Sequence, residues 1–435
     1  MKHNKKYRNE LTMNRIWILF LCLMCAAGMS AKNYFVAPAG DDNAPGTKQK
    51  PFATFGHAQR LAEAGDTVFF RQGTYRVTND EVQNYNGRYA NVFHLTRSGT
   101  AEAPIVFTGY KTERAVFDMS AVNPGDYRLS GILLSASHIV MRQLEITGLR
   151  VLQKGHSQSE CIRILGADNC VIDDMSFHDG MAIGIYLLAG KNNLIVNCDA
   201  YNNYDNYSDG GYGGNTDGFG AHCTSAEHTG NVFRRCRAWW NSDDGFDLIN
   251  CLAPVVIEDC VAFYNGFRPG TLHGAGDGTG FKAGGYGMKP RQNMVRNVPV
   301  VPRHVVRHCI AYRNKNKGIY SNHHLGGVEF TGNVSIANPR NYTLVCRKSM
   351  DEAVDVPGYG HILKDNISIA PIGKGQDYTD IDTARCTLER NYTADNIPAP
   401  KGKPLFDYST FVPEDYIQVG VRKWGNSKCD VVKMP

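Results

Sequence analysis

The sequence has little excess charge of either sign, and its one long hydrophobic run lies near its start. It contains 47 lysines and arginines against 42 aspartates and glutamates, a formal net charge of +5 over 435 residues. Such a small excess argues against a nucleic-acid partner. The lack of further long hydrophobic runs excludes a multi-span membrane protein. With 42% apolar and 20% charged residues the chain is neither disordered nor a small disulfide scaffold.

The first 31 residues have the three-part pattern of a secretory signal peptide. Basic residues precede an apolar stretch at 16–27 and small residues follow it, so we expect cleavage near Ala31. The stretch is shorter than the roughly 18 residues that a membrane span needs, which favours a signal over an anchoring helix. A lipid on Cys25 is a further alternative, although the preceding residues fit it poorly. Removing this segment leaves a net charge of +1, and we expect a secreted or periplasmic protein with no membrane span.

A short phrase recurs along the chain, with a cysteine, an alanine two residues later and an asparagine three residues after that. Its clearest copies begin at Cys198, Cys236, Cys260 and Cys309. With looser copies between 144 and 394, the starts are 23 to 49 residues apart, which is typical of a solenoid. Apolar and polar residues alternate within each copy, as in a half-buried strand, and amphipathic helices for a helical solenoid are lacking.

We therefore predict an all-β fold, a parallel β-helix. It forms a single catalytic domain over 32–435, with a short N-terminal cap helix near 55–64 and a C-terminal cap beyond about residue 395. Stacked copies place the four cysteines in an inward ladder, so we expect free thiols rather than disulfides. Four asparagines occupy one corner, where their amides bond the neighbouring coil. They are Asn203, Asn241, Asn265 and Asn314.

A second ladder is marked by a glycine followed by an isoleucine or phenylalanine. Because strand residues alternate in direction, the residue after each inward Ile or Phe points outward. The predicted outward row contains Gly220, Asp247, Lys282 and Tyr320. Neighbouring coils are about 4.8 Å apart, so like and unlike charges meet on this face.

Four carboxylates converge in this region: Asp217, Asp243, Asp244 and Asp247. Without a cation they would repel each other and raise each other's pKa. Ca²⁺ accepts six to eight oxygen ligands in flexible geometry, which suits a turn and its neighbour better than the strict octahedron of Mg²⁺. The alternative is an ordinary solvated turn at 241–245.

Lys282 lies in a glycine-rich segment at 278–285 that contains few other side chains. A lone outward lysine is usually just solvated. Beside a bound Ca²⁺, however, the ammonium is disfavoured and the pKa of the lysine falls from about 10.4, which produces a usable base.

Three segments, at 215–220, 237–247 and 278–282, resemble the signature segments of polysaccharide lyase family 9. The coil repeats extend this resemblance over most of residues 33–400. It implies a right-handed parallel β-helix enzyme that cleaves pectic polymers by β-elimination with calcium and a lysine base. Carried over, it implies Lys282 as the base and the four aspartates as calcium ligands, with a backbone carbonyl near Leu248 as a further ligand.

The sequence departs from the family pattern in two places. His222 stands where polygalacturonate-cleaving members are expected to have lysine, and the run at 319–324 replaces a more usual Phe-Asp-Gln-Asn. We therefore expect the rhamnogalacturonan I backbone as substrate, because its alternating acidic and neutral sugars need fewer cationic subsites. The predicted substrate-binding residues are His222, Arg313, Lys315, Lys317 and Asn322.

Three alternatives to a rhamnogalacturonan lyase stay open at this point. A pectate lyase would cleave polygalacturonate by the same mechanism. A β-helix glycoside hydrolase would use two of the aspartates as acid and base. A non-catalytic carbohydrate-binding solenoid would explain the repeats but not a lysine beside four aspartates, and the fold alone does not decide. We expect a monomer whose partner is a pectic polysaccharide.

Overall fold

Three long sheets, parallel except for one antiparallel pair of strands at an end of the third, carry almost all of the secondary structure in a computed structural model of the chain. The structure describes residues 31–285, 301–350, 352–372 and 376–396. The predicted signal peptide up to residue 30 and the predicted C-terminal cap after 396 lie outside these residues. Described residues from Asn33 onward belong to one compact unit. Within the described ranges no helix combines the length and hydropathy of a membrane span.

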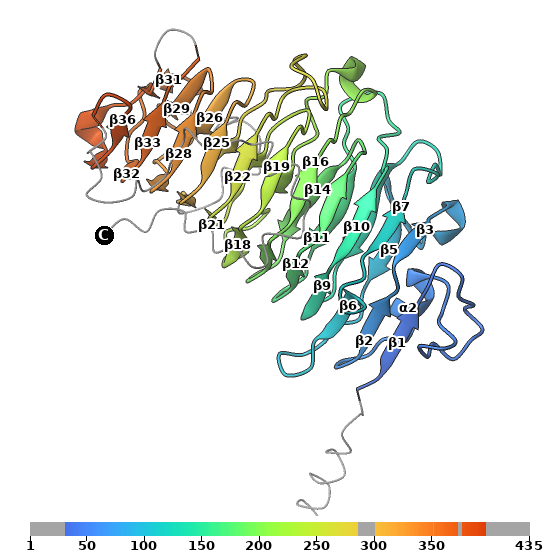
Figure 1. The fold of residues 1–435 in the computed structure, drawn as a ribbon. Helices are drawn as coiled ribbons and strands as arrows, with labels where there is room; N and C mark the ends of the chain where they lie inside the picture. The colour runs from blue at the N-terminus through green and yellow to red at the C-terminus, as the bar shows by residue number, and fades with distance from the viewer. Residues whose placement is uncertain (1–30, 286–300, 351, 373–375, 397–435) are drawn as a thin grey trace, which may run out of the picture. The chain divides into compact units, whose positions relative to one another are not determined.

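The chain visits the three sheets in turn, so that each coil adds one strand to each sheet and pairs with the coil before it (Figure 1). Sheet A has 12 strands: β1 (Asn33–Val36), β2 (Thr67–Phe70), β6 (Ile105–Gly109), β9 (Ile139–Arg142), β12 (Val171–Asp173), β15 (Leu194–Val196), β18 (Asn231–Arg234), β21 (Val255–Glu258), β24 (Val305–Arg307), β27 (Glu329–Thr331), β32 (Ile362–Lys364) and β35 (Thr387–Glu389).

Sheets B and C have 11 strands each. Sheet B contains β3 (Gly73–Arg76), β7 (Ala115–Asp118), β10 (Leu144–Thr147), β13 (Ser176–His178), β16 (Asp199–Tyr201), β19 (Arg237–Trp239), β22 (Val261–Phe263), β25 (Ile310–Tyr312), β28 (Val334–Ile336), β33 (Ile367–Ile369) and β36 (Tyr392–Thr393). Sheet C contains β4 (Asn84–Asn86), β5 (Tyr89–Leu95), β8 (Arg128–Leu134), β11 (Glu160–Leu165), β14 (Ile183–Ala189), β17 (Phe219–Ala221), β20 (Phe246–Asp247), β23 (Phe281–Lys282), β26 (Lys317–Tyr320), β29 (Arg340–Thr343) and β34 (Tyr378–Thr379).

The remaining elements are short. Strands β30 (Cys346–Arg347) and β31 (Asp355–Val356) form an antiparallel pair. Three 3-10 helices lie at Asn79–Glu81, Ser208–Gly211 and Thr383–Arg385. Helix α2 (Phe55–Leu61) is capped by Thr54, whose hydroxyl accepts from the His57 amide. The predicted helix extended to residue 64, but Ala62 adopts an extended ψ of 133° and ends it.

The predicted cysteine ladder and the predicted asparagine corner are both confirmed. Cys198, Cys236, Cys260 and Cys309 are fully buried free thiols. At the corner, the Asn241 side-chain amide donates to the Ala200 carbonyl and to Asn265 Oδ1, and Asn265 repeats the pattern with Asn314. Each coil therefore satisfies buried polar groups of the next, which fixes the register between coils.

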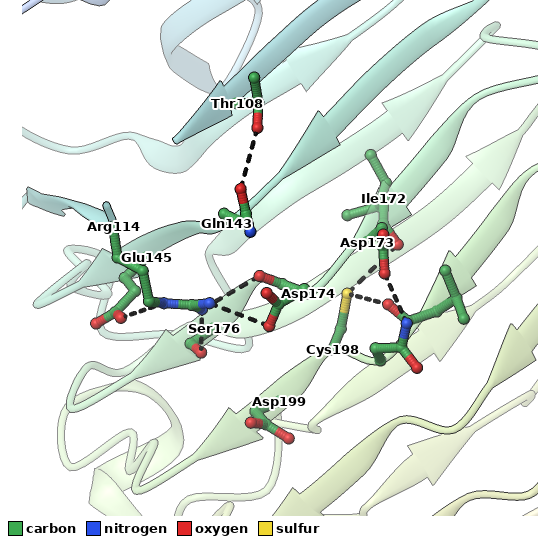
Figure 2. A network of polar contacts seen from close by, with 12 residues as sticks. Thr108, Arg114, Gln143, Glu145, Ile172, Asp173, Asp174, Ser176, Cys198 and Asp199 are labelled. Atoms are coloured by element: carbon green, nitrogen blue, oxygen red, sulfur yellow. Dashed lines mark hydrogen bonds and ion pairs between the residues drawn. The ribbon is translucent and has the colours of Figure 1, made fainter. Parts of the chain in front are cut away.

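Polar side chains on sheet B add a second set of links between coils. Arg114 bonds the Glu145 carboxylate at 2.8 Å and the Asp174 carboxylate at 3.0 Å, and it also contacts Ser176 (Figure 2). The Cys198 thiol donates to the Ile172 carbonyl at 3.4 Å. Arg114 therefore joins successive coils beside sheet B through ion pairs, whereas the buried Cys198 thiol links to the backbone of β12 in sheet A.

Candidate functional site

The site lies where the turns after sheet B strands enter β17, β20 and β23 of sheet C. Glycines make these turns tight, because a Cβ on Gly218 would lie 2.7 Å from the Gly245 carbonyl oxygen, and one on Gly245 would lie 2.6 Å from that of Gly280. Only glycine allows so close an approach between coils. The side chains on either side of each glycine are therefore brought close to those of the next coil.

Three of the four predicted carboxylates converge at this turn. Oxygens of Asp217, Asp243 and Asp244 lie within 4.8 Å of one another, and the three residues are at most 6% exposed. Backbone amides hold them, since the Asp244 amide donates to Asp217 Oδ1 at 3.1 Å and the Thr279 amide donates to Asp244 Oδ1 at 2.6 Å.

Lys282 lies directly beside this cluster. Its Nζ is 3.0 Å from Asp244 Oδ2 and 3.1 Å from Asp247 Oδ2. The fourth predicted carboxylate, Asp247, therefore contacts the lysine, and its other oxygen accepts from the Ile249 amide at 2.7 Å. Lys282 points outward from the sheet as predicted, yet it is only 8% exposed, because the carboxylates and the surrounding turns cover it. It is not a solvated surface lysine.

The charges in this group shift each other's protonation. Burial raises the pKa of Asp217 and Asp243 well above the ordinary range, and neighbouring carboxylates raise them further. Burial also raises the pKa of Asp244 and Asp247, although Lys282 opposes this effect. Burial alone would lower the pKa of Lys282, but the carboxylates of Asp244 and Asp247 outweigh it and raise that pKa.

The predicted outward row is confirmed in register. Gly220 pairs with Asp247, Asp247 with Lys282, and Lys282 with Tyr320. One coil earlier, Tyr186 pairs with Gly220. The candidate base therefore lies within a continuous row of side chains on the outer face of sheet C.

His222 lies next to this row. Its Nδ1 is 3.1 Å from the Tyr186 hydroxyl, and its buried Nε2 has no hydrogen-bond partner and lies 4.0 Å from Asp247 Oδ1. Burial, aided by the charge of Lys282, lowers the pKa of His222 to about 3. The side chain is therefore a neutral polar group beside the cluster, in place of the lysine expected at this position.

The other predicted substrate-binding residues are placed differently from one another. Lys317 begins β26, three residues before Tyr320 of the outward row, and its Nζ lies 4.3 Å from the ring centroid of Tyr320. Lys315 Nζ donates to the Ala275 carbonyl at 2.5 Å and to the Gly276 carbonyl, and so anchors the segment before Lys282. Arg313 is exposed at the end of β25 in sheet B, over the ring of Tyr312.

Asn322 is 2% exposed, and its amide donates to the Gly284 carbonyl at 3.1 Å. This contact supports the segment that follows Lys282. Sequence reasoning missed a fifth carboxylate, Asp277, whose Oδ2 is 4.0 Å from Lys282 Nζ and whose amide donates to Asp243 Oδ1 at 2.6 Å. Its position five residues before Lys282, directly before the glycine-rich segment at 278–285, was the available signal.

The donor set fits a hard divalent cation. Carboxylate oxygens are the ligands that Ca²⁺ prefers, and three of them already converge here. Asp244 Oδ2 is buried and accepts no hydrogen bond, so it depends on a positive charge for compensation. In the structure the Lys282 ammonium supplies that charge. Asp217, Asp243 and Asp244 would hold a cation, with Asp247 at its edge.

Comparison with known proteins places the chain in a family. The family model "Pel9A-like, right handed beta helix region" matches residues 34–359. The chain belongs to this family. The match confirms both the resemblance to polysaccharide lyase family 9 and the right-handed parallel β-helix.

Named relatives agree with this assignment. A solved rhamnogalacturonan lyase is 45% identical, with a TM-score of 0.80 over 83% of this chain and 87% of that one. The crystal structure of pectate lyase Pel9A is 26% identical, with a TM-score of 0.63 over 86% and 82%. Pectate lyase L of Dickeya chrysanthemi is 28% identical over 84% of this chain and 82% of its own. These relatives confirm the prediction of a polysaccharide lyase.

Proposed function

We propose that the protein is a secreted, calcium-dependent lyase that cleaves galacturonate-containing pectic backbones by β-elimination. The observation that carries this proposal is the position of Lys282, whose amine lies within 3.1 Å of two carboxylates at the edge of a buried three-aspartate cluster. The pectate and rhamnogalacturonan lyases among the relatives support the substrate class.

The residues have distinct roles in the reaction. The proton on carbon 5 of a galacturonate residue is α to a carboxylate, so its removal adds negative charge to an anionic group. Lys282 is the group that accepts this proton, and the oxygen on carbon 4 then leaves with the bonding electrons to give an unsaturated uronide. A bound Ca²⁺ would supply electrostatic stabilisation of the developing charge.

The amine of Lys282 must be neutral to act as a base. In the structure Asp244 and Asp247 hold it as an ammonium. When their charge is offset, burial is the effect that remains, and burial favours the neutral amine. The same carboxylates that would hold the cation therefore also determine whether the lysine is a competent base.

We propose rhamnogalacturonan I as the backbone that is cleaved. The 45% identical relative is named a rhamnogalacturonan lyase, and His222 places a neutral group beside Asp247 where a lysine was expected. Cleavage of polygalacturonate is the second candidate, supported by relatives that are named pectate lyases at 26–28% identity.

The geometry argues against a glycoside hydrolase. Its two catalytic carboxyl groups stand about 5 to 5.5 Å apart in retaining enzymes and roughly 6.5 to 9.5 Å apart in inverting ones. Here one oxygen from each of Asp217, Asp243 and Asp244 lies within 4.8 Å of the others, and the Lys282 ammonium contacts Asp244 and Asp247. The carboxylates are therefore grouped around a positive charge rather than set apart as an acid and a base. A binding-only solenoid would give no reason to bury Lys282 against these carboxylates.

The decisive experiment is incubation with rhamnogalacturonan I and with polygalacturonate, with and without a chelator, while ultraviolet absorbance of the unsaturated product is recorded. We expect activity that requires calcium, is restored poorly by Mg²⁺, and is abolished in Lys282→Ala. Lys191→Ala, which removes an exposed lysine paired with Glu227, is the matched control and should retain full activity. Near-normal turnover by Lys282→Ala would refute the base, and a preference for polygalacturonate of tenfold or more would refute the choice of backbone.

We also propose that the protein leaves the cytoplasm by cleavage of its signal peptide near Ala31 and acts as a monomer. Expression of the whole chain in its host, followed by N-terminal sequencing of the mature protein, tests the first point. Sedimentation of that mature protein tests the second.

A further inference from the structure

A cavity lies on the same edge of the β-helix as the aspartate cluster, closer to the N-terminus. Its volume is about 820 Å³. Four connections between sheets B and C line it, at 119–127, 148–159, 179–182 and 202–218. Its lining includes Asp126, Arg150, Gln153, Lys154 and Tyr207.

The side chains in this cavity suit an acidic sugar. Arg150 and Lys154 are exposed, and neither makes an ion pair with a carboxylate among the described residues. His156 is already paired, with its Nδ1 2.8 Å from Asp209 Oδ2. Asp126 is the one lining carboxylate, so the described lining has an excess of positive charge.

Neutral groups complete the lining. Asn206 carries an amide that matches a sugar hydroxyl, and the ring of Tyr207 is 41% exposed. The Gln153 amide is already bonded to the Asp126 carbonyl and to the Ser157 hydroxyl. An exposed aromatic ring beside an amide and cations is a surface that binds a pyranose ring together with its carboxylate. The cavity therefore combines recognition of charge with recognition of a sugar.

Its position relates it to the candidate catalytic site. The connection that carries Asn206 and Tyr207 ends at Asp217, a member of the aspartate cluster. Arg150 and Lys154 lie on the coil that joins β10 to β11, three coils before the turn that carries Asp244. At about 4.8 Å per coil this separation is about 14 Å along the stack. A pectic chain held at the cluster and running along the stack reaches this distance within a few sugar residues.

We propose that this cavity is a distal subsite, in which Arg150 and Lys154 bind the carboxylate of a galacturonate residue several sugars away from the cleaved bond. The inference rests on the proposed function for the direction in which the polymer runs. A pair of cations that make no ion pair among the described residues, at this distance from the cluster, gives long substrates an attraction that short ones lack.

The test measures binding and turnover separately. Isothermal titration calorimetry with the whole Lys282→Ala protein gives the affinity for saturated rhamnogalacturonan I oligosaccharides of increasing length. We expect Arg150→Gln combined with Lys154→Gln to weaken binding of long oligosaccharides about tenfold and to leave the shortest ones unchanged. In the otherwise wild-type enzyme the same pair should raise KM on long substrates at constant kcat.

Two controls make the result specific. Arg76→Gln combined with Lys50→Gln removes the same charges from exposed positions outside the cavity and should change neither affinity. The variant and its parent should bind carboxyl-reduced oligosaccharides of the same length with equal affinity. Unchanged affinity for long oligosaccharides, or an equal loss for short and long ones, would overturn the subsite. If no unsaturated product ever forms but the variant still loses uronate binding, the proposed reaction fails while the subsite stands.

Discussion

Removal of the Lys282 charge should destabilise the protein when no divalent cation is present, and calcium should reverse the loss. The ammonium lies 3.0 Å from Asp244 and 3.1 Å from Asp247, with its side chain 10% exposed. In Lys282→Met an apolar chain of similar length replaces it, and the Oδ2 atoms of both carboxylates lose the positive charge beside them. Breaking a buried pair in this way costs about 3 kcal/mol or more in the free energy of unfolding.

Calcium should stabilise the variant more than the wild type. In the wild type the ammonium already contacts Asp244 Oδ2 and Asp247 Oδ2, so a cation has to compete with it. In Lys282→Met that competition is absent. A cation at a hundred times its Kd stabilises the folded state by about 2.7 kcal/mol, which is nearly the size of the expected loss.

The assay is urea unfolding of both proteins in chelator and in millimolar calcium. The double variant Lys282→Met with Asp244→Asn is the matched control, because it removes one negative charge along with the positive one and should recover part of the lost stability. Equal stability of Lys282→Met and wild type in chelator would show that the carboxylates do not depend on the ammonium, and the electrostatic account of the site would be wrong.

Three further predictions concern the scaffold. Asn265→Ala should lower the free energy of unfolding by about 2 kcal/mol, measured by urea unfolding, because it removes the hydrogen bonds to Asn314, to the Ala238 carbonyl and to the backbone and side-chain amides of Asn241; an unchanged midpoint would contradict the ladder's role. Burial would lower the pKa of His178, but bonds to Asp179 and Glu145 outweigh it and raise it to about 9. The charged His178 ring should stabilise the folded protein by roughly 3 kcal/mol below about pH 6.5, and this contribution should be lost as the pH rises to 9. The difference in unfolding free energy between wild type and His178→Gln should therefore shrink over that range, and a constant difference would refute the raised pKa. Cys236 and its ladder partners should resist thiol labelling in the folded protein and show no disulfide on non-reducing gels; rapid labelling of the native state would argue against their burial.

The repeats allowed the register of the fold to be predicted. A residue in one coil has its counterpart one period later, so alternation within a strand was enough to place Asp247 beside Lys282 and Lys282 beside Tyr320. The same logic identified the buried cysteines and the asparagine corner. It worked because parallel coils stack in register and because each position repeats the same environment.

Positions outside the strands did not follow from that logic. The chain turns a corner at Arg313, which has a φ of 45°. For this reason the side chains of Arg313, Lys315 and Lys317 make separate contacts although the three residues are close in sequence. Asp277 approaches Lys282 from a turn without a repeat counterpart. The burial of Lys282 depends on how turns fold over sheet C, and strand alternation says only that a side chain points outward.

The glycine ladder explains why such a costly cluster forms here. Glycines at 218, 245 and 280 let each coil approach the next more closely than a side chain would allow, so carboxylates on adjacent turns are brought together rather than spread along the surface. Convergence creates a need for positive charge, and the outward position on the next strand, Lys282, meets it. In the structure the lysine compensates the aspartates. Under the proposed function a cation would take over that compensation and leave Lys282 buried but without ion pairs, which is the condition that a lysine needs in order to act as a base.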